Sequence, residues 1–216
     1  MCHNVRVPSE TTQTTAPSDT ADASPHRGRP GHTREDVIEA AVDLFTRHGY
    51  YATSMGQVAD SLGISKAALY HHISSKEQIL ELTVDHALNS LDEAFSRVEK
   101  SDATPGEKLR AVIHDTVVIL CDDPSSVALL LRMRGVSDVE LAAKARRREL
   151  TDRLVPIVAD AIQAGEIRSD VAPEVLTRLI FGTINAVSSW YDTDGVLDSE
   201  STSALVTDLI FTGIVA

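Results

Sequence analysis

From residue 33 onwards, apolar residues recur at spacings of three and four, which is the period of a helix with one buried face. One stripe runs from Val37 to Phe45 and another from Leu80 to Val98. No segment shows a convincing strand pattern, so the sequence predicts an all-α protein of about nine helices. The predicted helices span residues 33–48, 54–61, 66–72, 75–98, 105–121, 124–134, 138–164, 173–191 and 198–214.

Local signals mark the ends of the first three helices. Thr33 and Ser54 each begin a segment with the spacing of an N-terminal capping box. Gly49 stands where a left-handed cap would end the first helix, and Gly63 can supply the positive φ of a tight turn between two helices. Residues 54–72 therefore have the proportions of a helix-turn-helix.

The first 26 residues differ in composition from the rest of the chain. They are rich in Ser, Thr, Pro and Asp and hold almost no large apolar side chain, which is typical of a disordered tail. The sequence thus predicts a tail over residues 1–30, a helix-turn-helix domain over 31–77 and a larger helical domain over 78–216. Arg27 and Arg29 follow the tail, where they could enter a DNA minor groove or remain a solvated leader.

Charge and cysteine content narrow the function classes. The formal net charge of −12 is made of −2 in residues 1–25, zero in residues 26–78 and −10 in residues 79–216. The acidic excess therefore lies outside the helix-turn-helix, and a local phosphate-contacting face remains compatible with it. The two cysteines form no metal-ligand spacing, and neither a signal-peptide core nor a membrane-spanning run is present, so a cytoplasmic location is expected.

The second helix of a helix-turn-helix must approach the base edges of DNA. In its first turn, Ala67 could touch a thymine methyl group and Lys66 could reach a guanine edge or a phosphate. Hydroxyl, imidazole and ammonium groups nearby could contact phosphates. These groups belong to Thr53, Ser54, Tyr70, His71, His72 and Lys76. No metal site is expected, since adjacent histidines on a helix point about 100° apart.

Short motifs between residues 40 and 77 carry a resemblance to a known family. They are Ala40-Ala41, Leu44-Phe45, His48-Gly49-Tyr50, Thr53, Val58-Ala59, Leu62-Gly63-Ile64-Ser65, Leu69-Tyr70-His71-His72 and Lys76-Glu77. With these motifs the segment resembles the DNA-binding domain of the tetracycline-repressor family of bacterial regulators. By position, the resemblance implies that DNA is contacted by Thr53, Lys66, Tyr70, His71 and Lys76. Met55-Gly56 and Ile73 depart from the family's usual residues.

The same resemblance implies the role of the larger domain. It would bind a small molecule whose binding releases DNA, and the two last helices, about 173–191 and 198–214, would pair with those of a second copy in a homodimer. Both helices carry apolar stripes, which could alternatively fill only the core of one chain.

Three features bear on the ligand. Ser189-Trp190-Tyr191-Asp192 followed by Gly195 resembles a segment of family members that sense acyl-coenzyme A thioesters, which implies a ligand contact at Trp190. A basic cluster at Lys144, Arg146, Arg147 and Arg148 could pair with the phosphates of coenzyme A or be a solvated face. His114 and Arg132 could anchor an apolar ligand, or could be hydrogen-bonded core residues.

The sequence therefore predicts a ligand-responsive transcription regulator, most simply a repressor of a pseudo-palindromic operator with a hydrophobic or acyl-coenzyme A effector. Two alternatives remain: a helical enzyme or lipid carrier, and a regulator that responds to a protein partner. An enzyme should offer a nucleophile with a placed base, a metal spacing or a phosphate loop. No catalytic residue, metal or cofactor is expected, because none of these patterns is found.

Overall fold

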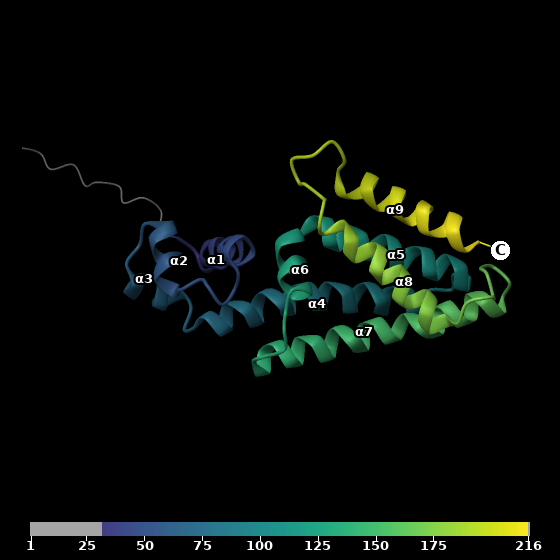
Figure 1. Cartoon of the computed structure of the whole chain (residues 1–216), viewed down its shortest axis with the longest axis horizontal. Coiled ribbons are helices and arrows are strands. Elements are labelled where there is room, and N and C mark those ends of the chain that lie inside the picture. Colours follow the sequence, from purple (N-terminus) through teal and green to yellow (C-terminus); the bar gives the residue numbers. More distant parts are fainter. Residues whose placement is uncertain (1–31, 216) are drawn as a thin grey trace, which may run out of the picture. The chain divides into compact units, whose positions relative to one another are not determined.

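The computed structural model describes residues 32–215, and within that range it holds nine helices and one isolated antiparallel bridge, between Ile167 and Val215. The helices are α1 (Arg34–His48), α2 (Met55–Leu62), α3 (Lys66–His72), α4 (Lys76–Glu99), α5 (Pro105–Asp122), α6 (Pro124–Leu131), α7 (Asp138–Gln163), α8 (Pro173–Val187) and α9 (Ser199–Ile214) (Figure 1). The all-α prediction is confirmed. The predicted tail over residues 1–30 lies outside the described part.

Hydrogen bonds at the helix starts explain why these segments are helical. Thr33 and Ser54 each form a complete capping box with the third residue of their helix. Gly63 adopts the left-handed conformation, with φ 66° and ψ 30°, and closes α2. Gly49 has φ 90° but ψ 140°, so it ends α1 without the left-handed cap that the sequence suggested.

Two helices end earlier than predicted. The helix α8 stops at Val187 rather than near residue 191, because the hydroxyls of Ser188 and Ser189 donate to the carbonyls three residues back. The helix α6 stops at Leu131, and the backbone N–H of Arg132 is shared among several preceding carbonyls. In both places the chain leaves the helix through a tight turn, which apolar spacing does not reveal.

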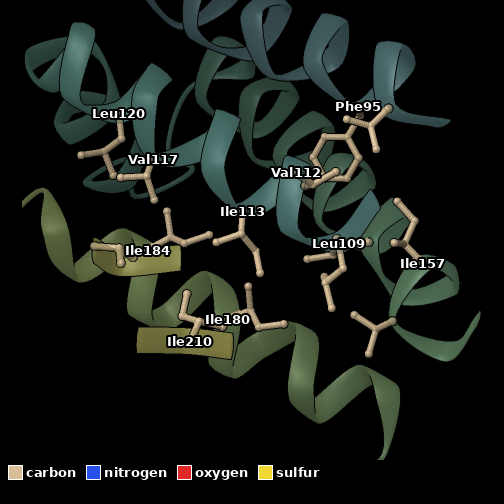
Figure 2. Packing of buried hydrophobic residues seen from close by; sticks show 14 of the residues in the cluster. Phe95, Leu109, Val112, Ile113, Val117, Leu120, Ile157, Ile180, Ile184 and Ile210 are labelled. Atoms are coloured by element: carbon tan, nitrogen blue, oxygen red, sulfur yellow. The ribbon is translucent and has the colours of Figure 1, made fainter. Parts of the chain in front are cut away.

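The buried apolar residues form two clusters. The first joins α1, α2, α3 and the first half of α4, and it extends to Leu129, Leu130, Ala143 and Leu150 of α6 and α7. The second surrounds α5, which packs against α4, α7, α8 and α9. Figure 2 shows Ile113 and Val117 of α5 directed towards Ile184 and Ile210. Because α6 and α7 contribute to the first cluster, the helix-turn-helix is packed directly onto the larger helical part.

Crossing a membrane requires a long helix made mostly of apolar residues, and none of the helices between residues 32 and 215 meets that requirement.

Candidate functional site

The helices α2 and α3 form a helix-turn-helix with one exposed reading surface. Ser65 caps α3 by accepting a hydrogen bond from the amide of Ala68, and Val58, Ala59 and Leu69 are buried between the helices. The opposite side of α3 faces solvent. Its exposed residues are Lys66, Ala67, Tyr70 and His71. Four of the predicted DNA contacts therefore share one surface, which has the placement that entry into a major groove requires.

Lys66 lies against the first turn of α2. A Cβ atom built on Gly56 would lie 2.8 Å from the Lys66 Cε and 3.1 Å from its Nζ, so the absence of a side chain at Gly56 leaves room for the lysine. This contact gives a structural reason for the glycine at position 56, but not for Met55. The lysine stem is supported by α2 while its exposed ammonium remains able to contact a phosphate or a base.

Thr53 is placed differently from the prediction. It is only 3 % exposed, and its hydroxyl donates to the carbonyl of Gly49 at 3.0 Å. The side chain therefore braces the turn between α1 and α2 and does not face the reading surface. Ser54 is exposed at the start of α2, with its hydroxyl already bonded to Gln57 as the helix cap.

Lys76 and His72 are partly buried. The Lys76 ammonium lies 4.2 Å from the centre of the Tyr50 ring, a cation–π distance, and burial lowers the pKa of this lysine. It stands in the first turn of α4. The predicted groove contacts Arg27 and Arg29 lie outside the described residues.

A cavity of about 270 Å³ lies between α4, α5, α6, α7 and α8. Its walls are largely apolar, and polar groups enter from three helices. The lining residues are Leu91, Phe95, Thr116, Ile119, Leu120, Val127, Leu130, Leu131, Arg147, Leu150, Thr151, Arg178, Phe181, Gly182, Ile184 and Asn185. A largely apolar hollow with a few converging polar groups is the usual form of a small-molecule site.

The two arginines of this cavity distinguish it from an ordinary packing defect. Arg147 comes from α7 and Arg178 from α8, and within residues 32–215 neither forms an ion pair with a carboxylate. The hydroxyls of Thr116 and Thr151 are bonded to backbone carbonyls of their own helices. The guanidinium groups are thus the cationic groups that the cavity offers to an anion.

Of the predicted ligand residues, the structure brings only Arg147 to this cavity. Arg148 is on the surface beside Asp152, with its side chain 85 % exposed. His114 faces Glu200 at the contact of α5 with α9, and Arg132 donates to the Thr46 carbonyl at the end of α1. Trp190 is exposed in the turn after α8. These four side chains lie away from this cavity, and their part in ligand binding stays a prediction.

Sequence reasoning missed Arg178 and Asn185. Both lie on α8 with Gly182, at spacings of four and three, so the three share one side of the helix next to its apolar stripe. A polar group repeated along the flank of a buried stripe is a signal that could have identified them. Elsewhere in the described part, no group of three or more His, Cys, Asp or Glu residues could hold a metal ion.

The helix-turn-helix and the separate cavity define a DNA-binding regulator that responds to a ligand. Family models for "Tetracyclin repressor-like, C-terminal domain" and "Bacterial regulatory proteins, tetR family" match residues 102–214 and 37–83. The chain belongs to the tetracycline-repressor family, whose regulators bind operator DNA and act as dimers. It is therefore a ligand-responsive transcriptional regulator, as the sequence predicted.

Individual relatives agree with this assignment. The chain is 26 % identical to the transcriptional repressor KstR2 of Mycolicibacterium smegmatis, over 86 % of this chain and 92 % of that protein. It is 28 % identical to the fatty acid metabolism regulator protein of Bacillus subtilis, over 82 % and 93 %. The structure of AibR in complex with isovaleryl coenzyme A and operator DNA is similar too, with 28 % identity, a TM-score of 0.69 and coverage of 82 % and 97 %.

Proposed function

We propose that this protein is a homodimeric repressor that leaves its operator when an acyl-coenzyme A thioester binds. The observation that carries the proposal is the cavity of about 270 Å³ with Arg147 and Arg178 in its largely apolar wall. Each copy would place α3 in one major groove of a pseudo-palindromic site, with centres about 34 Å apart. A DNA-bound regulator acts where the chromosome is, which in a bacterium is the cytoplasm.

The size of the cavity favours a compact acyl group. Small-molecule sites commonly span about 300–1,000 Å³, and this cavity is at or below the lower end of that range. It can therefore hold a short acyl chain, while the larger, phosphate-bearing part of coenzyme A would remain near the surface. Arginine binds phosphate in a bidentate geometry. Arg178 is exposed and Arg147 is half-buried, so both can reach a phosphate at the surface beside the cavity. The similarity to AibR, solved with isovaleryl coenzyme A, supports this class of effector.

The exposed sides of α8 and α9 support the dimer. Val175 and Leu179 of α8, and Leu205 and Leu209 of α9, are between 44 % and 68 % exposed. These four residues form what is called here the α8–α9 face. α8 and α9 are also in contact with each other (Figure 1). Apolar side chains grouped in this way mark a surface that another molecule covers, and in this proposal a second copy covers it.

Reversing the charge of Arg147 tests the effector. We expect Arg147→Glu to raise the isovaleryl-coenzyme A concentration needed for half-release of operator DNA by about tenfold or more, because a charge-assisted hydrogen bond contributes about 1.5–3 kcal/mol. Fluorescence anisotropy of labelled operator would measure the release. The matched control is Arg148→Glu, one residue along α7 and outside the cavity, which should change the value by less than about twofold. Equal effects of the two variants, or equal release by free isovalerate, would contradict the proposal.

The reading surface is tested by two alanine variants. Tyr70→Ala removes a hydroxyl suited to a phosphate and should weaken binding to every DNA sequence by a similar factor. Lys66→Ala should cost about 1–3 kcal/mol on the operator and less on random DNA, because base contacts supply sequence preference. Titrations of both variants against operator and random duplexes would measure this. An equal loss on both duplexes for Lys66→Ala would remove Lys66 from base recognition.

A further inference from the structure

A single hydrogen bond ties the turn between α1 and α2 to the start of α7. The Tyr51 hydroxyl donates to Oε1 of Glu140 at 2.6 Å, across 89 residues of sequence. Glu140 is only 2 % exposed, while Tyr51 reaches it from the surface of the helix-turn-helix. A carboxylate buried to this degree is uncommon in a protein unless specific donors hold it.

The other oxygen of Glu140 is fixed to the segment between α6 and α7. The backbone amides of Gly135 and Val136 donate to Oε2 at 2.6 and 2.8 Å. Burial alone would raise the pKa of Glu140, but the hydrogen bonds from Tyr51 and from these amides outweigh it and hold the pKa below its ordinary value. The carboxylate is therefore charged at neutral pH and accepts from both parts of the molecule at once.

A second contact runs in parallel with the first. The Arg132 guanidinium donates to the carbonyl of Thr46, near the end of α1, at 3.0 Å. Arg132 directly follows α6, so both contacts begin in the segment between residues 132 and 140. This segment therefore touches the end of α1 and the turn after it at two separate points.

The same segment continues from a wall of the effector cavity. Val127, Leu130 and Leu131 of α6 line that cavity, and Leu131 is the last residue of the helix. An occupant that pushes α6 must displace Arg132 and the chain that leads to Glu140. The cavity and the helix-turn-helix are thus joined by one short, continuous piece of chain.

We propose that Tyr51 and Glu140 are positioning residues, which hold the helix-turn-helix in its ligand-free, DNA-competent orientation until movement of α6 breaks their hydrogen bond. The inference rests on the proposed function for its consequence on DNA binding. The hydrogen bond itself is observed between two residues of the described part. If this hydrogen bond is removed in the absence of ligand, a larger fraction of the protein adopts the released conformation. Operator affinity is then lower from the start, and the effector can reduce it only by a smaller further factor.

Tyr51→Phe removes the hydroxyl and keeps the ring. In the DNA-free protein, we expect amide hydrogen exchange in residues 46–54 to accelerate about three- to tenfold, with little change in melting temperature. Operator affinity, measured on DNA selected by the wild type from a random pool, should fall by a similar factor. The factor by which isovaleryl coenzyme A lowers that affinity should fall equally. Glu149→Gln, an exposed residue on the same helix, is the matched control and should change none of these quantities.

A double-mutant cycle guards against indirect effects. Tyr51→Phe combined with Glu140→Gln should be no weaker on the operator than Glu140→Gln alone, because one bond cannot be lost twice. Unchanged exchange in Tyr51→Phe would overturn the inference, and so would faster exchange with an unchanged effector response. If the wild type selects no DNA, the proposed function fails, and the exchange measurement alone decides whether this pair holds the turn.

Discussion

Replacing Leu179 with glutamate should convert the protein to a monomer and lower its operator affinity by at least about 100-fold. Leu179 is 60 % exposed in the single chain, so a glutamate there disturbs no core packing. In the proposed dimer the residue lies on the α8–α9 face, where a buried and unpaired charge costs several kcal/mol. Since each copy binds one half-site, a monomer loses half of its DNA contacts, and 100-fold corresponds to about 2.7 kcal/mol.

The control for this variant adds the same charge elsewhere. Val196 is fully exposed in the loop between α8 and α9, outside the α8–α9 face, so Val196→Glu should remain dimeric. Sedimentation equilibrium would give the dimer dissociation constant of each variant, and anisotropy would give operator affinity at the same protein concentration. A Leu179→Glu protein that stays dimeric would place the dimer interface on another surface.

The helices could be predicted from the sequence because their signals are local. The capping boxes at Thr33 and Ser54 and the tight turn at Gly63 each depend on neighbours within a few residues, and all three are present in the structure. The same holds for the reading surface. Its exposed residues lie on one side of α3 because of their spacing along one short helix. They are Lys66, Ala67, Tyr70 and His71.

The candidate effector site could be predicted only in part, because packing partners decide which way each cation points. Three adjacent arginines of α7 have three separate surroundings: Arg146 bonds Asp85 and Asn89 of α4, Arg147 lines the cavity, and Arg148 is in solvent. Successive residues of a helix differ by about 100°, so a run of cations must divide among faces. The sequence shows the run but not which neighbouring helix each face meets.

Long-range polar contacts could not be predicted from the sequence for a similar reason. The Tyr51–Glu140 bond joins residues that have no shared pattern, and Glu140 in isolation looks like a surface residue in the first turn of α7. Thr53 shows the reverse case. The sequence predicts a phosphate contact for its hydroxyl because Thr53 is near the start of α2, whereas in the structure the hydroxyl donates to the carbonyl of Gly49. In each case a turn brings the two hydrogen-bonding partners together, and the path of that turn cannot be predicted from the sequence.

Phe95→Ala should be the most destabilising single change in the larger helical part, at about 3–5 kcal/mol. The ring is fully buried in the cluster around α5, lines the proposed effector cavity, and has the Arg153 guanidinium 5.2 Å from its centre. Total stabilities are commonly about 5–15 kcal/mol, so the loss is a large fraction of the whole.

The matched variant is Phe181→Ala, because Phe181 lines the same cavity from α8 but is only partly buried. Urea unfolding at one fixed protein concentration would give both free energies, and we expect the Phe181 variant to lose less than half as much as the Phe95 variant. Both substitutions enlarge the cavity, so both should extend effector selectivity towards longer acyl chains, while only Phe95→Ala strongly lowers stability. Equal losses of stability would mean that the ring of Phe95 is not the centre of this core.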